Sequence, residues 1–133
     1  MEIQDATKPT YDMKKLILLL FIPLVSFSQT YEEEKIKAEE VFESLSDDYI
    51  KTAALEFLRQ DDLAIANASK KYPNPSDWEA QWDYQSGLEN QFRLAWYKKQ
   101  KWWKKIKKSE SIALKVRSKI IAYALEKGWY DGL

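Results

Sequence analysis

Apolar side chains recur every three or four positions through long stretches of this 133-residue sequence. That spacing gathers them on one side of an α-helix, whereas strands would need strict alternation. The chain has only three glycines and four prolines, so few residues interrupt a helix. The sequence therefore predicts an all-α fold: a small helical bundle of four to five helices after an N-terminal signal segment.

The first 28 residues have the pattern of a secretory signal. A lysine pair at positions 14–15 precedes an apolar run over positions 16–25, and small residues flank Phe27 ahead of Gln29. A positive segment, a short apolar core and small residues before the cleavage point are the three parts of such a signal. The apolar core is shorter than the roughly 20 residues that span a bilayer as a helix. We expect cleavage near Ser28/Gln29, and the alternative is a membrane anchor left uncleaved.

Met13 stands directly before the lysine pair, where a compact signal begins. Residues 1–12 are polar and mixed in charge, so we interpret Met13 as the true start. The segment resembles the signals of Gram-negative bacterial exported proteins, which implies a periplasmic or secreted product. The mature domain is then residues 29–133. It has no cysteine and must fold without disulfides.

Helix boundaries follow from capping residues and breakers. A first helix is expected over residues 31–45, and Ser46 or Asp47 can cap a second. The second carries an apolar stripe at Ile50, Ala53, Ala54, Phe57 and Leu58. The acidic pair at positions 61–62 lies in the path of this stripe. Either the helix breaks there and restarts at Leu63, or it continues and turns its apolar face.

Two prolines at positions 73 and 75 forbid the helix from continuing through them. Ser76 and Glu79 then have the spacing of a capping box for a third helix, which is expected to reach Lys107. Ser109 is the expected cap of the last helix. Gly128 stands where a C-terminal glycine would close it.

Charge is distributed unevenly along a chain whose net charge is zero. Residues 93–119 hold eleven basic residues and one acid, and residues 31–48 hold eight acids and two lysines. Neutrality argues against a dedicated nucleic-acid binder. The local excess of positive charge nevertheless marks one part of the chain as a possible surface for anions.

On a helical wheel the third helix separates aromatic from basic residues. One face holds Leu88, Phe92, Ala95, Trp96, Trp102, Trp103 and Ile106. Lys99 is an exception among the aromatics, and Tyr97 lies on the basic side. The candidate binding residues are Arg93, Tyr97, Lys98, Lys101, Lys104, Lys105 and Lys108.

Two interpretations of this helix stay open. The simpler one is a core helix with a solvated basic back, lying beside the acidic first helix. The other is a surface for an anionic protein, polysaccharide or lipid membrane, since lysines near an anionic interface each contribute about 1 kcal/mol. Self-association of acidic and basic helices is a further possibility, whereas export argues against nucleic acid. Burial of Trp96, Trp102 and Trp103 would leave charge as the only surface signal.

No catalytic or cofactor motif is present, and we expect no cofactor and no metal. Without histidine or cysteine, a zinc site would need carboxylates alone. The alternative is a small carboxylate-dependent enzyme acting on carbohydrate, with Glu79 or Asp83 near Glu89 beside Trp78 and Trp82. It would require a concave pocket that holds both tryptophans. The sequence favours an exported, non-catalytic binding protein.

Overall fold

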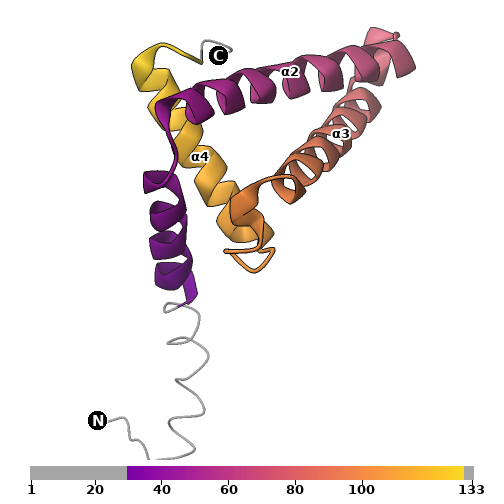
Figure 1. Cartoon of the computed structure of the whole chain (residues 1–133). Helices are drawn as coiled ribbons and strands as arrows, with labels where there is room; N and C mark the ends of the chain where they lie inside the picture. The colour runs from indigo at the N-terminus through magenta and orange to yellow at the C-terminus, as the bar shows by residue number, and fades with distance from the viewer. Residues whose placement is uncertain (1–29, 131–133) are drawn as a thin grey trace, which may run out of the picture. The chain divides into compact units, whose positions relative to one another are not determined.

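The computed structural model describes residues 30–130, and Figure 1 shows how their helices are arranged. The predicted signal, the proposed start at Met13 and the cleavage point at Ser28/Gln29 lie outside these residues. Residues 30–43 form the first helix. The elements that follow are α2 (Asp47–Lys71), η1 (Pro75–Asp77), α3 (Trp78–Lys98), η2 (Lys101–Trp103) and α4 (Glu110–Lys127). Residues 30–130 contain no strand, which confirms the all-α prediction.

From Lys37 onward the described chain forms one compact unit. Within it, α2, α3 and α4 lie along three sides of a triangle in the view of Figure 1. Its largest fully buried side chains are Phe57, Ile106, Val116 and Ile120. Phe57 meets Trp96 edge to face, with ring centroids 4.8 Å apart. The aromatic and aliphatic core therefore gathers residues from α2, from α3 and the segment after it, and from α4.

Helix α2 begins at the predicted cap and runs through the acidic pair without a break. The Ser46 hydroxyl accepts a hydrogen bond from the Tyr49 backbone N–H at 3.1 Å. Beyond Phe57 the buried positions are Gln60, Ala64 and Ala68, while Leu63 and Ile65 are exposed. The helix therefore continues through the acidic pair, and the alternative of a restart at Leu63 is wrong. The buried stripe shifts onto alanines, so Leu63 and Ile65 stay outside it.

The turn between α2 and α3 is where two prolines predicted it, but its caps differ from the expectation. The Asn74 side chain accepts a hydrogen bond from the Ser76 backbone N–H at 3.0 Å and starts η1. Helix α3 then follows with Asp77 at its N-cap and no side-chain capping bond. The predicted capping box of Ser76 and Glu79 is therefore wrong, because Ser76 lies inside η1 and the N-cap of α3 is Asp77.

Helix α4 has both predicted caps. The Ser109 hydroxyl accepts from the Ile112 backbone N–H at 3.1 Å, and Gly128 closes the helix at φ 77°. The Gly128 and Trp129 amides both donate to carbonyls of the last turn, which satisfies orphan acceptors there. A glycine suits this position because a side chain would be strained at that φ.

Helix α3 ends nine residues earlier than expected, at Lys98 instead of Lys107. The predicted helical wheel is therefore wrong beyond Lys98. Within residues 30–130, no helix combines the length and the apolar character needed to cross a bilayer.

Phe57 offers a direct test of this core, because it is 1% exposed and Leu55, two residues away on α2, is 58% exposed. We expect Phe57→Ala to lower the free energy of unfolding by about 3–5 kcal/mol through lost burial and the cavity left behind. Leu55→Ala should change it by no more than about 0.5 kcal/mol. Urea unfolding of both variants measures the difference, and equal losses would contradict the packing described.

Candidate anion-binding surface

Helix α3 stops because Gln100 leaves the helical conformation. Its side chain forms hydrogen bonds with Trp96 of α3 and with Tyr49 of α2. Its backbone is extended, at φ −84° and ψ 143°. Its side-chain Nε2 donates to the Trp96 carbonyl at 2.7 Å, and its Oε1 accepts from the Tyr49 hydroxyl at 2.5 Å. These bonds hold the chain reversal against α2.

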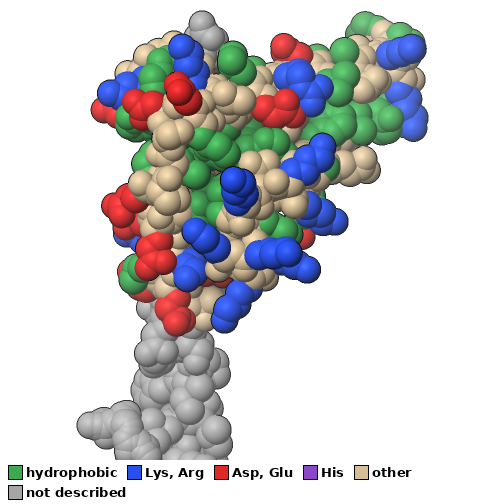
Figure 2. Space-filling view, viewed as in Figure 1, with side chains coloured by type: hydrophobic (Ala, Val, Ile, Leu, Met, Phe, Trp, Pro, Cys, Tyr) green, Lys and Arg blue, Asp and Glu red, His purple; other side chains and the backbone are tan. Residues whose placement is uncertain are grey.

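Around this reversal, from the last residue of α3 to the start of α4, runs a segment that we call the lysine loop, residues 98–108. Its seven lysines are all exposed, at positions 98, 99, 101, 104, 105, 107 and 108. Blue side chains gather over the α3–α4 connection in Figure 2. Within residues 30–130, none of the seven ammonium groups forms an ion pair with a carboxylate. The loop is therefore a concentrated positive charge that the described chain leaves unneutralised.

Three buried side chains fix the shape of the lysine loop: Trp102, Trp103 and Ile106. The Trp102 indole Nε1 donates to the Tyr49 hydroxyl at 2.9 Å. Trp103 stacks on Tyr97 with ring centroids 6.1 Å apart. Burial raises the pKa of Tyr49, which therefore stays protonated and can donate to Gln100. The loop is anchored by aromatic packing, so its lysines project from a defined backbone.

Two lysines near the end of the loop have left-handed backbone conformations, Lys107 at φ 55° and Lys108 at φ 58°. Such conformations cost energy for residues with a side chain and are held in place only by their surroundings. Here the Lys108 N–H donates to the Trp103 carbonyl at 2.9 Å, and the Lys107 N–H donates to that of Lys104 at 3.0 Å. The tight turn brings Ser109 to the start of α4.

The structure divides the predicted binding residues between two places. Lys98, Lys101, Lys104, Lys105 and Lys108 lie exposed on the lysine loop. Arg93 is half-buried on α3, and Tyr97 is only 4% exposed, so neither belongs to that exposed surface. Both line a groove between α3 and α4 instead.

Burial of the loop aromatics removes them from the surface. Trp102 and Trp103 are buried, and Trp96 is half-buried against Phe57. Charge is thus the only surface signal left on this part of the chain.

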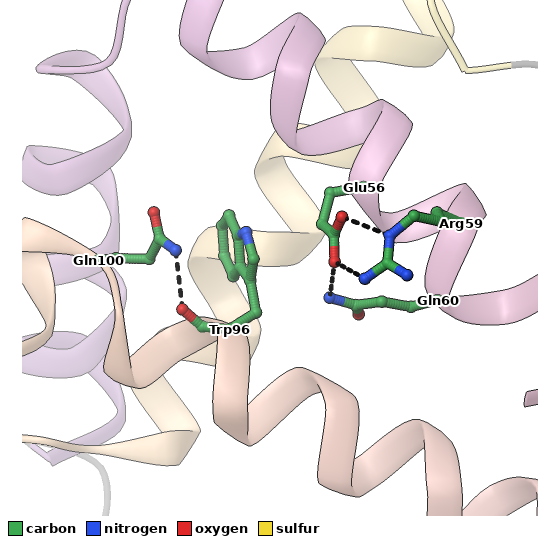
Figure 3. Close-up of polar contacts among 5 residues, drawn as sticks. All are labelled: Glu56, Arg59, Gln60, Trp96 and Gln100. Carbon is green, nitrogen blue, oxygen red and sulfur yellow. Dashed lines mark hydrogen bonds and ion pairs between the residues drawn. The ribbon is translucent and has the colours of Figure 1, made fainter. Parts of the chain in front are cut away.

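Beside the loop, a groove between α2 and the end of α3 has a cavity volume of about 380 Å³. Trp96, Gln100 and the Glu56–Arg59 pair border it, and Figure 3 shows the polar contacts there. Arg59 binds Glu56 through two hydrogen bonds of 2.8 and 2.7 Å, and this lowers the pKa of the Glu56 carboxyl. Lys99, the exception on the wheel, lies at this groove. The sequence analysis missed the site, although the spacing of Glu56 and Arg59 could have indicated their pairing.

Arg117 is a second feature that the sequence analysis missed. It is 8% exposed, and its Nε has no hydrogen-bond partner in the described chain. Its guanidinium lies over the Phe57 ring, with Cζ 4.7 Å from the centroid. The signal was present in the spacing, since Arg117 shares a helix face with the buried Ala113, Ile120 and Ala124.

Within residues 30–130, the two tryptophans on which the carbohydrate enzyme depends lie open to solvent. Trp78 and Trp82 are each 64% exposed on the first turns of α3, and Glu79 and Asp83 are exposed beside them. Side chains this open do not enclose a substrate. Among residues 30–130, no group of three or more histidine, cysteine or acidic residues is placed to hold a metal ion.

Comparison with known proteins adds no further constraint: the chain matches no family model, no curated protein and no solved structure.

The strained turn of the lysine loop predicts that substitution by glycine changes the free energy of unfolding in opposite directions at two lysines. Lys108→Gly should raise the free energy of unfolding by about 0.5–1 kcal/mol, because glycine adopts a left-handed backbone at little cost. Lys104, at φ −71°, has an ordinary conformation. Lys104→Gly should lower the free energy of unfolding by about 0.5–1 kcal/mol, because glycine gives the unfolded chain more freedom. Guanidinium unfolding distinguishes the two, and destabilisation by both substitutions would contradict the loop conformation.

Proposed function

We propose that this chain is a small exported, non-catalytic binding protein whose lysine loop attaches it to an anionic lipid surface. The observation that carries the proposal is the clustering of seven exposed lysines, none ion-paired within residues 30–130, on a loop of eleven residues. A lysine ammonium is a compact charge on a flexible side chain. It is therefore better suited to bind many lipid headgroups across a surface than to bind one anion in a pocket of fixed shape.

The attachment is electrostatic and reversible. Because Trp102 and Trp103 are buried, the loop offers no aromatic wedge for insertion into the acyl region. Each lysine near an anionic membrane contributes about 1 kcal/mol, so four to seven of them give about 4–7 kcal/mol. That range corresponds to dissociation constants from about millimolar to about ten micromolar. Binding of this kind weakens steeply with salt.

Other polyanions are less well supported by the same surface. Single-stranded nucleic acid is held largely by bases stacking on exposed aromatic rings, and both tryptophans of the loop are buried. An acidic protein usually needs a buried aromatic or arginine anchor at the centre of the contact. The loop supplies positive charge without such an anchor, which favours the lipid surface.

Export is the second part of the proposal. It rests on the lysine pair at positions 14–15, the apolar run over positions 16–25 and the small residues ahead of Gln29. Export would bring the lysine loop to a face of the bacterial envelope.

Liposome flotation tests the lysine loop. Mature protein from Gln29 should float with vesicles that contain anionic phosphatidylglycerol and should not float with neutral phosphatidylcholine vesicles. Changing Lys101, Lys104, Lys105 and Lys108 to Gln should abolish flotation, because about 4 kcal/mol of attraction is lost. Raising the salt to about 0.5 M should release the wild-type protein, since screening then acts within a few ångströms.

A matched control removes the same number of positive charges from outside the lysine loop. Changing Lys51, Lys70, Lys71 and Lys127 to Gln also removes four exposed lysines, but none from the loop. This variant should still float. Equal flotation of both quadruple variants, or flotation of neither wild type nor control, would refute the lipid-binding proposal.

Intact mass and N-terminal sequencing of the native product test export. We expect a chain that begins at or near Gln29. A native product that retains residues 13–28 and fractionates with the cytoplasm would contradict the assigned export, and one retained in membranes would indicate the uncleaved anchor.

A further inference from the structure

A second groove, distinct from the lysine loop, lies between α3 and the start of α4. Its cavity volume is about 490 Å³. Helix α3 contributes Asn90, Arg93, Leu94 and Tyr97, and α4 contributes Glu110 and Leu114. The groove therefore combines a cation and a phenol with two leucine side chains.

Two polar atoms in and next to this groove are buried without a partner. They are the Tyr97 hydroxyl and the Arg117 Nε, on side chains 4% and 8% exposed. Folding normally satisfies such groups, and leaving one unsatisfied is destabilising. The ring of Arg117's neighbour Phe57 offsets part of this cost for the guanidinium, but the Tyr97 hydroxyl has no such contact. Such groups call for a structural explanation, and a bound ligand would supply one.

The two unpartnered groups lie near a third donor, Arg93. The charges of Arg93 and Arg117 both act on the Tyr97 hydroxyl, and those two guanidinium groups repel each other. Within the described residues neither arginine forms an ion pair with a carboxylate. Among the described residues, Arg93 makes one hydrogen bond, a long one of 3.5 Å to the Asn90 side chain. Arg93 therefore has most of its five N–H donors available.

Two carboxyl groups, those of Asp61 and Glu110, act on this cluster, and a third, that of Glu89, acts on Asp61. Asp61 acts on Arg117, and burial raises the pKa of its carboxyl. Glu110 is exposed at the groove and acts on Tyr97. Glu89 accepts a hydrogen bond from Gln85 at 3.2 Å. Within the described residues, none of these three carboxylates forms an ion pair with Arg93 or Arg117.

We infer that this groove is a binding site for a small carboxylic acid with an apolar body. The Tyr97 hydroxyl is closed to solvent in the unliganded chain, so binding requires a side-chain movement at the floor of the groove that lets the carboxylate reach both Arg93 and this hydroxyl. The apolar part of the ligand packs on Leu94 and Leu114. A guanidinium fork matches the two oxygens of a carboxylate, and a neutral phenol adds a third donor. The ligand should carry an apolar group next to its carboxylate, because Leu114 presents a half-exposed apolar side chain to the groove. A small, fully hydrated anion would make no contact with this side chain.

Such a ligand is either a free organic acid or the C-terminal carboxylate of a peptide that ends in a branched residue. Both share the same chemistry at the site. A peptide needs an open end of the groove through which the rest of its chain can leave, whereas a free acid does not. Two probes therefore distinguish the two ligands.

The test is isothermal calorimetry with 4-methylpentanoate and with the dipeptide N-acetyl-Ala-Leu. We expect wild-type protein to bind at least one of them saturably, and the uncharged 4-methylpentanamide and the dipeptide amide at least about tenfold more weakly. Preference for the monoacid indicates a free acid, and preference for the dipeptide indicates a peptide terminus. No saturable binding of either acid, or equal binding of acid and amide, overturns the inference.

Three variants locate the site. Arg93→Gln and Tyr97→Phe should each weaken binding about tenfold or more, whereas Glu110→Gln should tighten it by removing a like charge from the groove. Tyr97→Phe is the decisive variant, because its lost hydroxyl makes no hydrogen bond in the described chain and the fold should be at least as stable without it. Unchanged affinity in Tyr97→Phe overturns the assignment even if Arg93→Gln fails to fold.

Controls separate this inference from the lipid proposal. Arg59→Gln removes an exposed arginine from the other groove and should leave affinity for the acid unchanged. The lysine-loop quadruple variant should also bind the acid normally, and Tyr97→Phe should still float with anionic vesicles. Loss of acid binding in Arg59→Gln would instead place the ligand in the groove between α2 and α3, against the inference.

Discussion

Burial of the adjacent pair Trp102 and Trp103 determines the shape of this chain after α3. A tryptophan buries about 150–250 Å². At about 25 cal/mol per Å², the pair contributes at most about 8–12 kcal/mol. Continuing α3 as a helix would avoid the left-handed backbone at Lys107 and Lys108, which costs about 1–2 kcal/mol at each residue. Burial is the larger quantity, so the chain reverses at Gln100 and carries the lysines around the buried rings.

The same reversal separates two kinds of positive charge that are mixed in the sequence. Lysines of the loop remain in solvent, where their charge is screened and available to a large anionic surface. Arg93 and Arg117 are drawn toward the core, where fewer water molecules compete for their donors. An acidic and a basic side chain meet where Lys119 Nζ lies 3.5 Å from Glu39 of the first helix. An exposed pair of this kind contributes at most about 1 kcal/mol.

Local signals in the sequence predicted much of the fold. The serines at 46 and 109, Gly128 and the two prolines act within one turn of backbone, and the structure has helix boundaries at or beside each. The end of α3 could not be predicted in this way, because lysines and tryptophans spaced three or four apart fit a longer helix equally well. What decided it was contact with Tyr49, about fifty residues away in sequence. The lysines of the candidate surface were identified correctly as exposed, whereas Tyr97 and Arg117 required knowledge of how α3 and α4 pack.

The alanines of α2 have a consequence for motion. Beyond Gln60 only Ala64 and Ala68 are buried on this helix, and neither belongs to the main core cluster. The end of the α2–α3 hairpin is joined instead by surface contacts, such as the Gln81 amide at 3.3 Å from the Tyr72 carbonyl and Lys71 over the Tyr84 ring. So little apolar area resists separation there that this end should open and close many times for each global unfolding event. Amide protons near Trp78 would then exchange with solvent far sooner than those near Phe57. The hairpin would be rigid at the end that packs in the core and would open locally at the end near Trp78.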